Sequence, residues 1–236
     1  MGIALAAEYA AGVVCSLIVL SRVVFSPMTL EHEYAVLGGY NRTHVGRWLY
    51  AAAALISAVI VFLVLSSIDL ARTWGLNVNL PPTALSLVSA GAVYAALYWF
   101  FSRYAWKFGP LSGILRLPDL SGQWICEGIP IRPGKGQPWT GRITVVQSWD
   151  RLQIHVETEQ SISDSIAAAL QYDAGAGYHL MYHYRNQPRA RERRLAPHHG
   201  FAEISFSRDL QSGSGDYFNG RGRNTFGTMA WTREPA

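Results

Sequence analysis

Two stretches of the chain, residues 48–68 and 80–102, contain no charged residue. They hold 21 and 23 residues, and about 20 apolar residues suffice for an α-helix to cross a bilayer. The pattern predicts transmembrane helices at about residues 48–70 and 80–103. A third apolar stretch, within residues 3–25, contains Glu8 and is followed by Arg22, with no basic residue before it as a signal peptide would have. We interpret it as an additional membrane-embedded helix, either spanning or interfacial.

After residue 118 the pattern changes to short runs of alternating apolar and polar residues separated by turn sequences, which is typical of β-strands. The connections are short and no long amphipathic helix intervenes, so the sheet is predicted to be antiparallel. Eight strands in about 110 residues suit a compact closed barrel. The predicted fold class is all-β, an antiparallel eight-stranded β-barrel (residues 119–236) that follows a transmembrane α-helical region (residues 1–118). The predicted strands are residues 122–130, 139–149, 152–159, 165–172, 178–185, 200–207, 214–221 and 228–232.

Charge is distributed unevenly around the apolar segments. Arg42 and Arg47 precede the first predicted hairpin helix, Arg103 and Lys107 follow the second, and Arg72 alone lies between them. Because cytoplasmic loops carry the excess of basic residues, the barrel is predicted to be cytoplasmic. The net charges of residues 1–118 and 119–236, +3 and +1, are too small to indicate binding to a DNA or RNA polymer.

The sequence contains no recognisable catalytic motif. His198 and His199 could ligate a metal, but no Cys or carboxylate joins them at ligand spacing. Cys15 and Cys126 lie in very different segments, which indicates two buried thiols and no disulfide framework. We therefore expect a protein that is not an enzyme and that has no metal or cofactor.

Binding is better supported, because polar and aromatic residues alternate within several predicted strands. Polar groups inside a barrel are costly unless something pairs with them. Aromatic rings beside amides, hydroxyls and Arg are what a nucleobase with a phosphate would need. The alternative, that this phase of the strands faces water, stays open. The residues of this pattern include Gln147, Trp149, Ser161, Ser163, Ser165, Tyr182, Tyr184, Asn186, Tyr217, Asn219, Arg221 and Arg223.

The order of the motifs resembles that of a known family. A predicted transmembrane hairpin precedes a series of short motifs, and their order together with the hairpin resembles the two-transmembrane, β-strand-rich effectors of bacterial cyclic-oligonucleotide antiphage signalling (CBASS). The motifs are Asp119-Leu-Ser-Gly-Gln-Trp124, Trp139-x-Gly141, Ile143-x-x-x-Gln147-x-Trp149, Thr158-x-x-Ser161-x-Ser163-x-Ser165, Tyr182-x-Tyr184-x-Asn186-x-Pro188, His199-Gly200 and Gly215-x-Tyr217-Phe218-x-x-Arg221.

The resemblance implies a membrane effector of the bacterial inner membrane. Its barrel would bind a cyclic dinucleotide made by a partner synthase, form a homo-oligomer when occupied, and disrupt the membrane lipids to cause abortive infection. The extra apolar stretch at residues 3–25 departs from a strict two-helix layout. The predicted ligand-binding residues are Trp149, Tyr184 and Tyr217 as stacking partners, Gln147, Ser163 and Asn186 as readers of base edges or ribose, and Arg221 or Arg223 as phosphate contacts.

Two other functions are compatible with a membrane-anchored barrel. A lipid or apolar-ligand carrier would have a mostly aliphatic lumen. A non-enzymatic adaptor would recruit proteins through the barrel surface and bind no small ligand.

Overall fold

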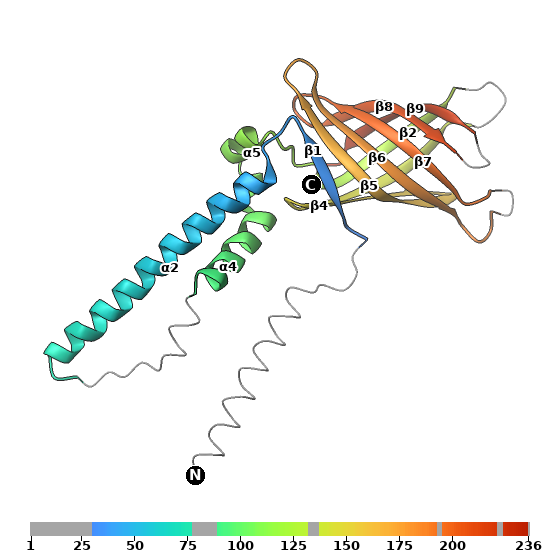
Figure 1. The fold of residues 1–236 in the computed structure, drawn as a ribbon. Helices are drawn as coiled ribbons and strands as arrows, with labels where there is room; N and C mark the ends of the chain where they lie inside the picture. Colours follow the sequence, from blue (N-terminus) through green and yellow to red (C-terminus); the bar gives the residue numbers. More distant parts are fainter. Residues whose placement is uncertain (1–29, 77–88, 132–136, 193–194, 221–223, 236) are drawn as a thin grey trace, which may run out of the picture. The chain divides into compact units, whose positions relative to one another are not determined.

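The computed structural model describes residues 30–76, 89–131, 137–192, 195–220 and 224–235 (Figure 1). Residues 32–236 form one compact unit that holds every element discussed below. Its helical elements are α2 (Arg42–Thr73), α4 (Ala90–Arg103), the 3-10 turn η1 (Ala105–Lys107) and α5 (Gly109–Leu115).

Helix α2 contains the first predicted transmembrane helix and extends it at both ends. It begins where Asn41 Oδ1 accepts a hydrogen bond from Thr43 N at 2.8 Å, which satisfies one of the open N–H groups of the first turn. Its 32 residues span about 48 Å at 1.5 Å per residue, more than a bilayer core of about 30 Å. Within the described part of the chain it is the one helix long and apolar enough to cross a membrane.

The other predicted helices are described only in part. Helix α4 covers the second half of the predicted helix at 80–103, whose first residues lie outside the described ranges, as does the stretch at 3–25. Helices α2 and α4 pack together, with the Tyr50 and Tyr94 rings edge to face at a centroid distance of 6.2 Å.

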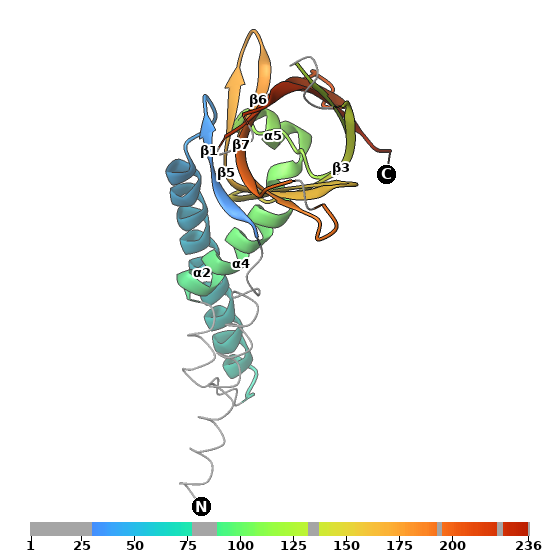
Figure 2. The same cartoon turned by 90° about the vertical axis from the view of Figure 1, so that its right-hand side faces the viewer.

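The strands form one closed sheet in the order β1-β4-β3-β2-β9-β8-β7-β6-β5. Figure 2 shows them as a ring. All pairs are antiparallel except β1 with β5, so the prediction of an all-β antiparallel barrel is confirmed. The strands are β1 (His32–Leu37), β2 (Gly122–Pro130), β3 (Trp139–Gln147), β4 (Arg151–Thr158), β5 (Ser161–Asp173), β6 (Gly177–Pro188), β7 (His198–Phe206), β8 (Ser212–Asn219) and β9 (Phe226–Arg233).

Strand β1 is a ninth strand that the sequence analysis did not predict. Strands β4 and β5 pair directly only over His155–Asp164, Val156–Ser163 and Glu157–Ile162. Beyond these pairs β1 lies between them, antiparallel to the start of β4 and parallel to the second half of β5. The wall of the barrel is thus completed by a segment that precedes α2 in the chain.

A bulge in β5 marks the point where the two strands separate. The register with β6 shifts between Ser165 and Ala167. The Ser165 hydroxyl there accepts a hydrogen bond from Ile154 N of β4 at 2.9 Å and lies 2.8 Å from His32 Nε2 of β1. One serine side chain therefore joins three strands where the regular ladder is interrupted.

The two ends of the barrel differ. At one end, here called the plugged end, lie the β3–β4, β5–β6 and β7–β8 connections and the fully buried Leu117 and Leu120 of the segment entering β2. Trp124 packs there against Phe206 and Trp231 at ring-centroid distances of 5.6 and 6.0 Å. The opposite end, here called the open end, carries the β2–β3, β4–β5, β6–β7 and β8–β9 connections.

Candidate functional site

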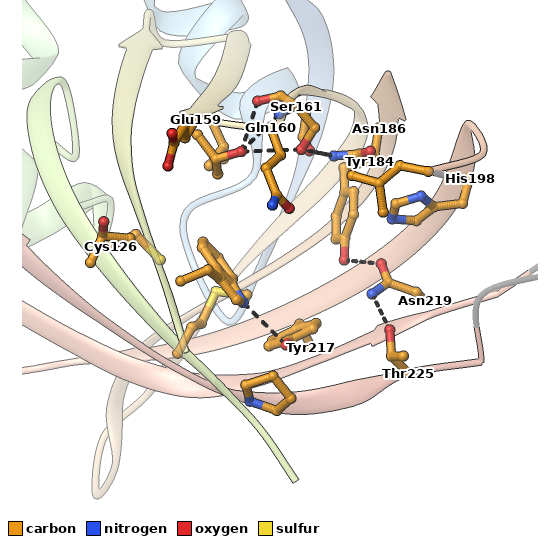
Figure 3. Close-up of a pocket in the computed structure, with 18 of the residues that line it drawn as sticks. Cys126, Glu159, Gln160, Ser161, Tyr184, Asn186, His198, Tyr217, Asn219 and Thr225 are labelled. Carbon is orange, nitrogen blue, oxygen red and sulfur yellow. Dashed lines mark hydrogen bonds between the residues drawn. The ribbon is translucent and has the colours of Figure 1, made fainter. Parts of the chain in front are cut away.

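A cavity of about 570 Å³ lies at the open end of the barrel (Figure 3). Small-molecule sites in proteins typically enclose 300–1,000 Å³. The inward-facing residues of the strands form its walls, so the alternation seen in the sequence becomes a lining. Its inner part is formed by buried side chains from the middle of four strands, namely Cys126, Ile143, Tyr182 and Met229.

One wall is a polar cluster from the ends of β4, β5 and β6, here called the serine–asparagine corner and consisting of Thr158, Ser161, Ser163 and Asn186. Asn186 Nδ2 donates to Ser161 Oγ and to Ser163 Oγ, both at 2.8 Å. The two serines are brought together because they alternate on β5, and Asn186 is paired with Ser163 across the β5–β6 ladder. Asn186 is 5% exposed, and its Oδ1 has no hydrogen-bond partner among the described residues.

The adjoining part of the wall, on β6 and β8, combines an aromatic ring with a second amide. Tyr184 Oη donates to Asn219 Oδ1 at 2.8 Å, and Asn219 Nδ2 donates to Thr225 Oγ1 at 2.8 Å (Figure 3). Both amide atoms of Asn219 are therefore occupied by the protein, and the Tyr184 hydroxyl is held in place by β8.

A second aromatic pair completes the lining. Trp139 Nε1 donates to Tyr217 Oη at 3.2 Å, with the rings edge to face at 5.8 Å. Two glycines make room for these rings: a Cβ on Gly128 would collide with the Trp139 indole, and one on Gly200 with the Tyr184 ring. Larger residues at either position would push an aromatic side chain into the cavity.

The described lining is almost free of charge. It contains no Arg or Lys, and its one carboxylate, Glu159, is exposed. Burial raises the pKa of the Cys126 thiol to about 12 and holds the pKa of Tyr182 well above its ordinary value, so both groups are neutral at pH 7. The cavity thus offers ring faces and neutral hydrogen-bonding groups.

The two adjacent histidines point to opposite faces of the wall. His198 lines the cavity (Figure 3), while the ring of His199 lies tilted against that of His183 at a centroid distance of 5.3 Å. Across the described ranges, no three His, Cys, Asp or Glu side chains gather as a metal site would require.

The structure separates the predicted site residues into three groups. Ser163, Tyr184, Asn186 and Tyr217 line the cavity together. Gln147 and Trp149 lie at the plugged end, outside the cavity lining. Arg221 and Arg223 lie outside the described residues.

Gln147 faces inward, as predicted, but its amide is bonded to the protein itself. Its Oε1 accepts from Leu120 N at 2.8 Å, and its Nε2 donates to Pro118 O at 3.1 Å. It therefore ties the segment that enters β2 to the end of β3.

Trp149 packs against the helical region. Its ring meets Phe101 of α4 edge to face at 5.2 Å, and its backbone N–H donates to Ser102 O at 3.1 Å. The guanidinium of Arg42, the first residue of α2, donates to Trp149 O at 3.1 Å and lies over the Tyr34 ring at 4.5 Å. The contacts of Gln147 and Trp149 are those of structural residues.

Several lining residues were not among the predicted site residues. Ser161 and Asn219 belonged to the alternating pattern, and Trp139 to a motif, so a signal existed for each. His198, the first residue of β7, was considered only as a metal ligand, and Thr225 precedes β9, so alternation indicated neither as a lining residue.

Comparison with known proteins gives two kinds of similarity. Residues 115–233 match the family model described as Cap15, cyclic dinucleotide receptor domain, and residues 43–107 match the model described as Cap15, TM helices. The chain is also 43% identical over 203 residues to the CD-NTase-associated protein 15 of Yersinia aleksiciae, which covers 86% of this chain and 97% of that protein.

Proposed function

The chain belongs to the Cap15 family of CBASS membrane effectors, and we propose that its barrel is the receptor for a cyclic dinucleotide made by a partner synthase. The observation that carries the proposal is the cavity at the open end of the barrel, which lies within the region matching the receptor model. Ring faces and neutral polar groups in one cavity suit nucleobases, which stack and form hydrogen bonds through their edges.

The lining argues against the alternative of a lipid carrier. Burying an apolar chain against the serine–asparagine corner would leave polar groups without partners, which is unfavourable. Four predicted residues, Ser163, Tyr184, Asn186 and Tyr217, remain the proposed ligand contacts, joined by Trp139. Gln147 and Trp149 are no longer proposed as contacts.

We place the protein in the bacterial inner membrane as a multi-pass protein with a cytoplasmic barrel. Four residues separate the end of β1 from the start of α2, and α5 leads into β2 through residues 116–121. Both ends of the segment 42–103 are therefore tied to the same barrel, which requires an even number of crossings between them. A hairpin formed by α2 and the segment containing α4 meets this condition.

We further propose that ligand binding promotes self-association of the barrel, and that the associated hairpins disrupt the membrane lipids. A ligand shifts such an equilibrium only by its difference in affinity between the two states. A tenfold preference corresponds to about 1.4 kcal/mol per subunit, and coupling among several subunits increases the effect.

The binding proposal is tested by calorimetry on the full chain in detergent with a panel of cyclic dinucleotides. The full chain is needed because β1 belongs to the barrel wall. We expect one or more ligands to bind and to increase the mass of the complex in light scattering. Absence of binding to every cyclic dinucleotide would refute the proposal.

The effector proposal is tested in cells that co-express the synthase, by membrane-potential dye. Phe62→Arg places a charge near the middle of α2, where it costs about 2.5–3.5 kcal/mol in a bilayer; Thr73→Arg, at the end of α2, is the matched control because a terminal Arg reaches the interface. We expect depolarisation with wild type and Thr73→Arg and none with Phe62→Arg. Equal depolarisation by all three would show that α2 does not act on the membrane.

A further inference from the structure

The serine–asparagine corner contains one buried amide oxygen without a partner among the described residues, and the hydrogen-bond network determines which amide atom it is. Thr158 Oγ1 donates its proton to Ser161 O at 3.0 Å. Towards Ser161 Oγ, at 3.2 Å, it must therefore accept, so the Ser161 hydroxyl donates to Thr158. The Ser161 oxygen is then available to Asn186 only as an acceptor.

This order fixes the orientation of the Asn186 amide. Because Ser161 Oγ can only accept from Asn186, the amide nitrogen of Asn186 must point towards Ser161. This agrees with the hydrogen bonds from Asn186 Nδ2 to Ser161 and Ser163. A primary amide has two N–H donors, and both are used by the serines. The remaining atom, Oδ1, is a buried acceptor with no partner among the described residues.

A buried carbonyl oxygen of this kind has a specific requirement. It needs a donor, and it repels any group that presents only oxygen lone pairs. The phosphodiesters of a cyclic dinucleotide are anionic acceptors, and no Lys or Arg contributes to the described lining. Asn186 Oδ1 therefore favours an N–H or O–H donor over a phosphate oxygen.

The neighbouring ring supplies the second feature of a base site. Tyr184 precedes Asn186 by two residues on β6, so both side chains face the cavity, as Figure 3 shows. The hydrogen bond to Asn219 holds the ring, and a base stacked on an aromatic face presents its edge to groups beside that face.

We propose, building on the cyclic dinucleotide function above, that one nucleobase of the ligand enters the serine–asparagine corner and donates an N–H of its Watson–Crick edge to Asn186 Oδ1, with the phosphates directed away from that oxygen. Asn186 is then a specificity-determining residue that selects for a base with a donor at that position.

The test is a double-mutant cycle between Asn186 and the ligand, with the full chain in detergent. The tightest ligand of the cyclic dinucleotide panel is compared with analogues that each lack one donor. The analogues carry inosine or N1-methylguanosine for guanosine, purine riboside for adenosine, 2-pyrimidinone riboside for cytidine, N3-methyluridine for uridine, or a 2′-deoxyribose. Each is titrated against wild type and against Asn186→Leu, which has a similar volume and no acceptor.

We expect the wild type to lose about 10- to 100-fold in affinity when the relevant base donor is removed. Asn186→Leu should bind the parent ligand that much more weakly and should not distinguish it from the analogue, because the partner of the donor is already gone. Asn219→Leu is the matched control, because both amide atoms of Asn219 are bonded to the protein. The affinity loss caused by this substitution should be independent of the loss caused by any base analogue, so the two losses should add.

Other outcomes overturn the inference. The inference is wrong if the affinity losses caused by Asn186→Leu and by each base analogue simply add. It is also wrong if Asn186→Leu is coupled only to the 2′-deoxy analogue, because ribose would then be the group at Asn186. Thermal unfolding of each variant verifies that it is folded, and Asn186→Ala repeats the cycle if Asn186→Leu is not. If no panel member binds wild type, the proposed function itself fails together with this inference; if ligands bind and the losses are additive, only this inference fails.

Discussion

At the plugged end of the barrel, Gln147 uses both atoms of its amide on the chain itself, whereas Asn186 at the open end keeps its oxygen without a partner among the described residues. Both are inward-facing amides at the end of a strand, and both are about 95% buried. The surroundings differ: Gln147 meets the backbone of residues 118–120, and Asn186 borders a cavity. The same residue pattern thus stabilises the fold at one end and leaves an amide oxygen without a partner among the described residues at the other.

The largest expected effect distinguishes the aromatic residues of the two ends. Trp149→Ala removes a 2% exposed ring packed on Phe101 and should lower the free energy of unfolding by about 3–5 kcal/mol. Trp139→Ala removes a half-buried ring from the cavity and should cost about 1–2 kcal/mol. Urea unfolding followed by tryptophan fluorescence measures both.

Ligand affinity should change in the opposite order. Trp139→Ala is expected to weaken binding more than tenfold through lost stacking, while folded Trp149→Ala should bind within about threefold of wild type. If Trp149→Ala weakened binding more than Trp139→Ala, the cavity would be the wrong site.

The two amides provide the next comparison, with the same substitution at each end. Gln147→Leu leaves Leu120 N and Pro118 O buried without their partners and should cost about 2 kcal/mol of stability, with little change in the affinity of the folded protein. Asn186→Leu removes a carbonyl that is already unpaired, together with the N–H donors of Ser161 Oγ and Ser163 Oγ. Both hydroxyls line the cavity, where water can replace the amide, so the cost should be only about 1 kcal/mol. Urea midpoints of the two variants check this, and a larger loss for Asn186→Leu would contradict the proposed difference between the ends.

A smaller effect is expected when one hydroxyl of the cavity is removed. Tyr184→Phe keeps the ring but leaves Asn219 Oδ1 without its donor, which should cost about 1 kcal/mol of stability and weaken ligand binding about three- to tenfold. Tyr178→Phe, on the β5–β6 hairpin and outside the cavity lining, is the control and should leave calorimetric affinity unchanged. Equal affinities for the two variants would show that the Tyr184 hydroxyl does not contribute to binding.

The smallest effect concerns the thiol between the two ends. Burial raises the pKa of Cys126 to about 12 from an ordinary value of 9.0, so above pH 9 the unfolded chain releases this proton while the folded chain retains it. Stability from the neutral thiol is complete below pH 9 and is lost as the pH rises from 9 towards 12. Between pH 7 and 10 the wild type should lose about 1 kcal/mol more than Cys126→Ala, measured by urea unfolding at each pH. Parallel pH profiles would show that the thiol does not contribute.

The sequence predicted eight of the nine described strands, and period-two alternation grouped the polar and aromatic residues on one phase. It left open whether that phase faces the lumen or water, and the structure shows that Ser163, Asn186 and Tyr217 are buried. Alternation did not report the level along the barrel axis. Gln147 and Trp149 share the inward phase of the cavity residues, but they lie where β3 ends against residues 117–120 and α4. Whether an inward-facing residue lies at the plugged or the open end depends on where the segments before and after its strand pack against the barrel. Alternation contains no information about that position.

Strand β1 was missed for a related reason. It is only six residues long, and its partners begin at Arg151, so no local feature of its sequence indicates that it is paired. The bulge at Ser165 was equally invisible, although it creates the place that β1 occupies. Of the site itself, the order of motifs identified the strands that form it, while the orientation of the Asn186 amide required coordinates.

The position of β1 also determines the order in which the protein can be made. More than a hundred residues separate Leu37 from Arg151, and at about 5–20 residues per second the ribosome needs roughly 6–20 seconds to synthesise them. During that interval helices α2 and α4 are synthesised, and β1 cannot yet pair because strands β4 and β5 have not been made. Closure of the barrel wall is thus a late event that follows synthesis of the membrane hairpin, and a competent receptor exists only on a chain whose hairpin has already been made.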